Sequence, residues 1–208
     1  NAEPAWKDNY ICLCTELYLA TGDQAYKTEA LSYASDIKDG NWVLDYQNGE
    51  DLALFNLARL GNTTSEGILQ SIVNRYVAAA QSNGVIKVGG DWGKLRYTGG
   101  ALFTIALYQA LKKETTINAK LLSSVNYILG FNSSSQSYVV GFGSKAPKQP
   151  HHRNVYESDA NNMSGLSITS KNQQHGYLIG GALDGSMQDD INNYQYTEGG
   201  IDYNAGFV

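Results

Sequence analysis

The chain has 208 residues, of which 42% are hydrophobic and 17% charged, and its formal net charge is -5 at pH 7. This length suits one domain with a sizeable core, and the negative balance argues against a nucleic-acid backbone as partner. No apolar run approaches the length of a membrane span, so a membrane protein is not expected either.

Apolar residues recur at the spacing of an amphipathic helix in six successive segments, most of which end at a glycine. The segments are residues 10–21 with Asp8 or Asn9 as N-cap, 23–38, 50–60, a fourth that runs to residue 80 after Thr63 or Thr64 as N-cap, 98–113 and 116–129. No shift in composition divides them, so residues 1–208 are predicted to form one all-α domain built as an array of paired helices.

The two cysteines, Cys12 and Cys14, lie two positions apart in the first helical segment. Their side chains point to different faces of a helix, so a disulfide between them is not expected. We interpret both as small buried hydrophobic residues, which fit a secreted protein poorly. The chain opens with Asn-Ala-Glu-Pro, without Met or a signal segment, and this start suggests processing or truncation.

A glycine- and proline-containing loop follows the helices and a short extended run at residues 138–140. The loop ends in His151, His152 and Arg153, whose side chains are hydrogen-bond donors suited to an oxygen-rich ligand. On this chemistry alone, a solvated loop or a small metal site on the two histidines is an equally good interpretation.

A second polar stretch near the C-terminus carries Asp189, Tyr194, Glu198, Asn204 and Ala205. Together the two stretches resemble the paired signatures of the glycoside hydrolase family 9 cellulases. The first signature closes on Pro-His-x-Arg, as residues 150–153 do, and the second has the same spacing of Asp, aromatic residue, Glu and Asn-Ala pair. This chain departs from the second signature at Met187, where the family usually has an aromatic residue, and at Gly200, where it usually has Ser, Thr or Ala.

Three further stretches, at residues 16–23, 92–97 and 126–130, are similar to stretches of the same family. The resemblance therefore covers almost the whole chain, and it implies an (α/α)6 barrel. Six helices and a loop-rich tail make about half of such a barrel, so we expect the chain to be the C-terminal part of one catalytic domain. The Asp-Ala-Gly-Asp stretch that holds the base in the family's N-terminal half does not occur here. Because a lone half-barrel exposes large apolar faces, we expect the other half to accompany the chain.

Inverting hydrolysis of a glycosidic bond needs a protonated carboxyl at the leaving oxygen and a carboxylate about 6.5–9.5 Å away that activates water. Glu198 is the candidate acid, because its glycine- and tyrosine-rich context favours desolvation and hence the protonated form. The resemblance implies the same role. It also implies that Asp189 supports the catalytic site without acting as the base, and that His151 and Arg153 bind sugar hydroxyls beside the cleavage point. Tyr194 is a candidate for the wall of the cleft.

The remaining candidates are given mostly structural roles. We expect His152 to be structural and His175 to form loop hydrogen bonds. Trp92 and Trp42 are expected to anchor the core or loops, with stacking on sugars as the alternative for each. The mechanism requires no cofactor. Some members of the family carry structural calcium near the helix that begins here at Asp8, and a calcium site is left open.

The predicted function is hydrolysis of internal β-1,4 bonds in cellulose and related glucans with inversion, by a secreted enzyme. Glu198 would be the acid, and the N-terminal half would supply the base. Two alternatives stay open: an exo-acting member that releases cellobiose or amino-sugar disaccharides, and a non-catalytic carbohydrate-binding fragment, which the missing Asp pair favours. An unrelated helical-repeat interaction protein would require both signatures to be coincidental.

Overall fold

The computed structural model describes residues 6–157 and 172–208. Their elements are α1 (Trp6–Thr21), α2 (Gln24–Ser32), η1 (Ala34–Asp36), α3 (Glu50–Arg59), α4 (Thr63–Ala78), α5 (Lys94–Leu111), α6 (Ala119–Ile128), η2 (Arg153–Tyr156), α7 (Tyr194–Thr197) and α8 (Ile201–Ala205). The six longer helices are the six predicted segments, and β pairing in the described residues is limited to isolated bridges. The all-α prediction is confirmed. None of the described helices is long and apolar enough to cross a membrane.

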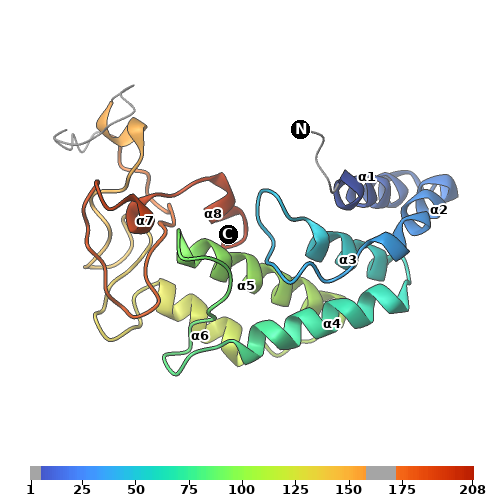
Figure 1. Cartoon of the computed structure of the whole chain (residues 1–208), viewed down its shortest axis with the longest axis horizontal. Coiled ribbons are helices and arrows are strands. Elements are labelled where there is room, and N and C mark those ends of the chain that lie inside the picture. The colour runs from blue at the N-terminus through green and yellow to red at the C-terminus, as the bar shows by residue number, and fades with distance from the viewer. Residues whose placement is uncertain (1–5, 158–171) are drawn as a thin grey trace.

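The helices pack against their neighbours along the chain (Figure 1). α1 lies against α2 and α3, α3 lies against α4, and α5 lies against α4 and α6. In Figure 1, α4 and α5 run along the base, α1 and α2 form one end, and the loop-rich segment after α6 forms the other end. α8 packs on α5 at the concave side between the two ends, so the C-terminus lies inside an open crescent.

One hydrophobic core runs through the crescent. Its fully buried side chains include Leu54 of α3, Ile72 of α4 and Ile105 of α5. The loop-rich end joins the same core through Tyr138 and Ile179. Burial of each such aliphatic side chain contributes about 1.5–3 kcal/mol, so the loops that carry the candidate site rest on a rigid base.

Helix boundaries differ from the predictions where capping chemistry decides them. The second helix ends at Ser32 and continues as the 3-10 turn η1. The fourth is capped by Asn62, whose Oδ1 accepts a hydrogen bond from the Ser65 N–H at 2.9 Å. The fifth begins at Lys94, directly after Gly93, whose φ of 64° is in the left-handed region. Asn and Gly at these positions are strong start signals that hydrophobic periodicity does not report.

α5 and α8 approach each other through glycines. A Cβ added to Gly206 of the α8 C-terminus would lie 2.9 Å from backbone atoms of Gly99 and Gly100 in α5. A Cβ on Gly100 would lie 2.3 Å from the Leu44 carbonyl oxygen on the loop before α3. Glycine inside a helix costs stability, and here it permits the close approach that brings α8 into the concave side.

One carboxyl group is buried between α3, α4 and α5. Asp51 is 5% exposed, and its Oδ2 accepts hydrogen bonds from the Tyr76 hydroxyl at 2.8 Å and the Thr104 hydroxyl at 2.9 Å. The Tyr76 oxygen also lies 2.8 Å from the Trp42 carbonyl oxygen, which links this group to the loop before α3. Burial raises the pKa of Asp51 to about 6, because the hydrogen bonds from Tyr76 and Thr104 offset only part of the desolvation.

Candidate active site

Glu198 follows the last residue of the short helix α7, and α8 begins three residues after it. Its N–H donates to the Tyr194 carbonyl at 2.9 Å, and its own carbonyl accepts from the Gly180 N–H at 2.7 Å. The preceding residue, Thr197, is fully buried. The backbone of Glu198 is therefore fixed, and its side chain extends from a rigid turn.

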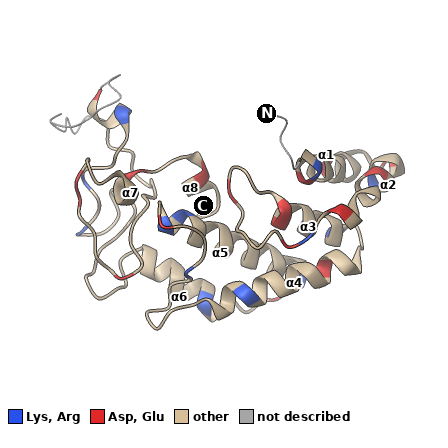
Figure 2. Ribbon diagram, in the orientation of Figure 1, with Lys and Arg blue, Asp and Glu red and all other residues tan. Residues whose placement is uncertain are grey.

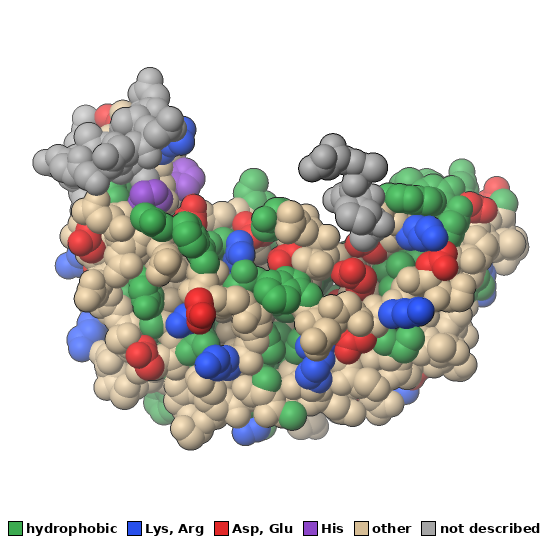
Figure 3. Space-filling model, in the orientation of Figure 1, with side chains coloured by type: hydrophobic (Ala, Val, Ile, Leu, Met, Phe, Trp, Pro, Cys, Tyr) green, Lys and Arg blue, Asp and Glu red, His purple; other side chains and the backbone are tan. Residues whose placement is uncertain are grey.

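A cleft of about 660 Å³ opens beside this carboxyl group. It is lined by Tyr46, Trp92, Arg96, Glu198, Gly199, Gly200, Asp202 and Tyr203. Figure 3 shows the hollowed upper side of the molecule, and Figure 2 shows acidic residues on α8 and around the start of α3, on either side of that hollow. The cleft is therefore formed by the start of α5, the Glu198 turn and the loop before α3.

Trp92 is the direct partner of the candidate acid. Its indole Nε1 donates to Glu198 Oε2 at 2.6 Å, and the side chain is 42% exposed. This bond fastens the segment before α5 to the Glu198 turn, and the exposed ring stays available to stack on a sugar. Trp42 does anchor a loop as predicted, since its indole donates to Asp45 Oδ2 at 2.8 Å.

Three rings form a row next to Glu198. The ring centroids of Trp92 and Tyr194 are 4.9 Å apart, and those of Tyr194 and His151 are 5.5 Å apart. Tyr194 is 43% exposed. Such a row offers apolar ring faces with polar edges, which suits the C–H faces and hydroxyls of sugars. The structure thus brings together three of the residues predicted for the site, Glu198, His151 and Tyr194.

His151 is held on both its backbone and its ring. Its N–H donates to the Thr197 carbonyl at 2.9 Å, and the segment forms a parallel bridge with Glu198. The ring Nδ1 lies 2.6 Å from the Ile191 carbonyl oxygen. Because a carbonyl can only accept, Nδ1 carries a proton in this contact, which leaves Nε2 for a ligand. Arg153, predicted to bind substrate, is exposed and is the first residue of η2.

The carboxylate of Asp189 forms hydrogen bonds with the loop before His151 and not with the residues that line the cleft. Its Oδ2 accepts from the Lys148 N–H and its Oδ1 from the Gln149 N–H, each at 2.8 Å. Both amides immediately precede the Pro150-His151 pair. Both oxygens of Asp189 thus hold the loop before His151, and its supporting role in the catalytic site stays a prediction.

Replacing Asp189 by Asn should lower the free energy of unfolding by about 1–2 kcal/mol, because an amide offers one acceptor where two charge-assisted hydrogen bonds are needed. Urea unfolding measures the effect. Asp190→Asn is the matched control, since Asp190 Oδ1 accepts from Asn192 in an exposed turn. Equal losses in the two variants would contradict this role for Asp189.

Asp202 is the other carboxylate on the wall of the cleft. It lies 3.3 Å from Arg96 Nη1. The guanidinium of Arg96 stands over the rings of Tyr97, at 4.5 Å, and Tyr203, at 5.1 Å, which fixes its position. Asp202 is therefore committed to an ion pair, whereas the Glu198 carboxyl receives only an indole N–H in the described structure.

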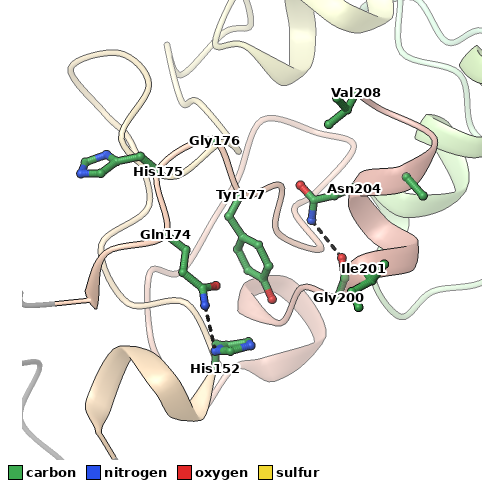
Figure 4. A pocket seen from close by; sticks show the side chains of 10 residues that line it. His152, Gln174, His175, Gly176, Tyr177, Gly200, Ile201, Asn204 and Val208 are labelled. Carbon is green, nitrogen blue, oxygen red and sulfur yellow. Dashed lines mark hydrogen bonds between the residues drawn. The ribbon is translucent and has the colours of Figure 1, made fainter.

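A second hollow of about 580 Å³ is lined by residues that include Gly200 and Ile201 (Figure 4). His152 lines it, with its Nδ1 3.3 Å from Gln174 Nε2 and its ring edge-on to Tyr177 at 5.8 Å. Burial, together with the nearby His151, lowers the pKa of His152. The structural role predicted for His152 agrees with these contacts, and His175 points away from the other labelled side chains in Figure 4.

Both carboxyl oxygens of Asp8 accept hydrogen bonds from backbone N–H groups, and a calcium site beside it stays a prediction. Asp8 lies in the first turn of α1, not at its N-cap, and is 3% exposed. Its Oδ1 accepts from the Asn9 N–H at 2.7 Å and its Oδ2 from the Gly49 N–H at 2.9 Å, which ties α1 to the start of α3. Across residues 6–157 and 172–208, no three His, Cys, Asp or Glu side chains gather in a way that could hold a metal ion.

Comparison with known proteins identifies the family. The family model described as "Glycosyl hydrolase family 9" matches residues 1–208. The chain belongs to glycosyl hydrolase family 9. It is 31% identical to "Endoglucanase 4" of Bacillus sp. (strain KSM-522), over 92% of this chain and 33% of that protein. It is also 31% identical to "Endoglucanase" of Dictyostelium discoideum, over 100% of this chain and 30% of that protein.

The solved structures of this family share the fold. The cellulase Cel9M of C. cellulolyticum superposes with a TM-score of 0.82 at 27% identity, over 97% of this chain and 48% of that chain. An endoglucanase of the termite Nasutitermes takasagoensis gives a TM-score of 0.82 at 26% identity, over 97% of this chain and 49% of that chain. The chain thus spans about a third of the length of the curated relatives and about half of these structures, so it corresponds to about half of the family's (α/α)6 barrel.

Proposed function

We propose that this chain is the acid-bearing half of a secreted, inverting endo-β-1,4-glucanase that acts on cellulose-like glucans. The observation that carries the proposal is the Glu198 carboxyl, held at 2.6 Å by the Trp92 indole in an open cleft with an aromatic wall. The family membership supports it. So do solved relatives: Cel9M, 28% identical, is known in complex with cellobiose, and CelQ of Clostridium thermocellum, 29% identical, with cellotriose.

In this proposal, Glu198 donates its proton to the leaving glycosidic oxygen. The row of Trp92, Tyr194 and His151 supports the sugar rings, and His151 Nε2 with Arg153 binds hydroxyls beside the cleaved bond. The water-activating carboxylate must stand about 6.5–9.5 Å from the acid. We assign it to the other half of the barrel, because Asp202 is ion-paired with Arg96.

Glucan binding without catalysis is the second candidate. It is favoured by the same ion pair, because a chain whose other cleft carboxylate is neutralised has no free base for water. Both candidates share the glucan-binding surface, and they differ only in whether a second half is joined to it.

Binding of cellotetraose tests the shared surface. Trp92→Ala should weaken binding by about 5–10-fold, because it removes a ring on which a sugar stacks, an effect of about 1 kcal/mol. Isothermal titration calorimetry of the chain measures it. Trp42→Ala is the matched control, since Trp42 is 40% exposed but its indole donates to Asp45. Similar weakening in both variants, or no binding by the unchanged chain, would overturn the assignment of this cleft.

A further inference from the structure

The side chain of Asn204 pairs with the main chain of Leu178 in the way a neighbouring strand would. Its Oδ1 accepts from the Leu178 N–H at 2.8 Å, and its Nδ2 lies 3.5 Å from the Leu178 carbonyl oxygen. Nδ2 also donates to the Gly200 carbonyl at 2.9 Å, as drawn in Figure 4. One amide therefore joins α8 and the turn before it to the segment around Leu178.

The Leu178 N–H depends on this contact. The neighbours of Leu178 pair with residues 138–140 on the other side, where Val140 donates to Tyr177 and Ile179 donates to Tyr138. The Leu178 N–H and carbonyl consequently face α8, and the residue is fully buried. A buried N–H that loses its acceptor is costly, so the segment is expected to shift if Asn204 is removed.

The same segment holds both members of the Trp92–Glu198 hydrogen bond. Two residues after Leu178, the Gly180 N–H donates to the Glu198 carbonyl at 2.7 Å. The Gly180 carbonyl accepts from the Leu95 N–H at 2.9 Å, in the first turn of α5 that follows Trp92. A shift of this segment therefore moves the acid and its indole partner relative to each other.

The backbone segments around Leu178 and Glu198 are in such close contact that one cannot move without the other. A Cβ on Gly199 would lie 2.6 Å from the Leu178 carbonyl oxygen. A Cβ on Gly180 would lie 2.7 Å from the Gln195 carbonyl oxygen, which in turn accepts from the Gly93 N–H at 3.1 Å. Backbones in contact through glycines transmit a displacement directly from Leu178 to the Glu198 turn.

We infer that Asn204 is a positioning residue for the acid: through Leu178 and Gly180 it sets the Glu198 carboxyl against the Trp92 indole. The catalytic meaning of this inference rests on the proposed function of Glu198. The contact itself is measurable without catalysis.

The indole N–H signals of the chain's three tryptophans report the contact in 1H–15N spectra. Trp92→Phe identifies the Trp92 signal, and Glu198→Ala, which removes the acceptor of the indole N–H, gives the position of a free indole. In Asn204→Ala the Trp92 signal should move toward that free-indole position. Asn204→Asp keeps an acceptor for Leu178 and loses the donor for Gly200, so it should show a partial shift.

Asn132→Ala is the matched control. Asn132 also bridges backbone groups through both ends of its amide, but its partners are Tyr127, Ser134 and Gln136. This variant should lose stability and leave the Trp92 signal unchanged.

An unchanged Trp92 signal in folded Asn204→Ala would overturn the inference and leave Asn204 a purely structural residue. If that variant does not fold, Asn204→Asp decides in the same way. Failure of the proposed function is separate: hydrolysis that survives Glu198→Gln would remove the catalytic role of Glu198 while the effect of Asn204 on the Trp92 signal would stand.

Discussion

Replacing Glu198 by Gln should lower kcat on soluble cellulose derivatives by about 10²–10⁴-fold in a preparation that contains both halves of the barrel. Glutamine preserves the size of the side chain and cannot give a proton to the leaving oxygen. KM should change little, because the rings of Trp92, Tyr194 and His151 that support the sugar are untouched. Steady-state kinetics on the two proteins measures the effect.

The leaving group separates proton donation from a structural role. An aryl cellobioside whose phenol is strongly acidic leaves without protonation, so Glu198→Gln should slow it far less than it slows cellulose. An equal loss of kcat on both substrates would contradict the role of Glu198 as general acid. Trp92→Phe is a useful companion, because it removes the hydrogen bond to Glu198 and keeps the carboxyl.

Replacing Asp51 by Asn should stabilise the chain by about 1–2 kcal/mol at pH 8 and destabilise it by about 1–2 kcal/mol at pH 4. The pKa of buried Asp51 is raised to about 6, above the value of about 3.9 for an exposed Asp. The protonated carboxyl of Asp51 therefore stabilises the folded state fully below about pH 3.9, the pKa of an exposed Asp. This stabilisation is lost as the pH rises through about 6, the pKa of Asp51 in the folded chain. A pKa difference of two units changes the free energy of unfolding by about 3 kcal/mol between low and high pH. Asn forms weaker hydrogen bonds with Tyr76 and Thr104 than the carboxyl does, which lowers the stability of the variant at every pH.

Urea unfolding of the two proteins between pH 4 and pH 8 measures this difference. Asp8→Asn is the control, since Asp8 is equally buried but accepts two backbone N–H groups, so its loss should destabilise the chain. A gain for Asp51→Asn that does not grow with pH would contradict the account of Asp51. The hydrogen bonds of Tyr76 with Asp51 and Trp42 make the loop before α3 the segment whose protection from hydrogen exchange should also change.

Hydrophobic periodicity predicted all six longer helices. Each helix buries one face against a neighbour, and that face appears in the sequence as apolar residues at helical spacing. Periodicity placed the ends less well. The start of α5 depends on the left-handed Gly93, and the start of α4 depends on Asn62, and neither signal is periodic. Gly99 and Gly100 lay inside the predicted segment 98–113, but their contact with Gly206 is not visible in the sequence.

The candidate acid and its neighbours were predicted from two signatures, each of which groups its residues within a short stretch of sequence. For Trp92 the sequence predicted an anchor or a sugar-stacking ring but not the bond to Glu198, because that bond joins positions 106 apart and no local pattern records such a pairing. One usable signal existed, namely a tryptophan and a glycine directly before a helix start. The buried state of Asp51 had no signal at all, since it follows from the packing of three helices against one another.

The most direct test of the account is the release of reducing ends from a soluble β-1,4-glucan by the chain alone, with Glu198→Gln beside it. Cellotetraose binding establishes that the preparation is folded, and intact mass establishes that no second polypeptide is present. The account predicts no release that depends on Glu198, because the base belongs to the other half of the barrel. Release by the unchanged chain that is lost in Glu198→Gln would contradict it. The base would then lie within these residues, with Asp202 on the cleft wall as the first candidate and Asp159, which lies outside the described residues, as the next.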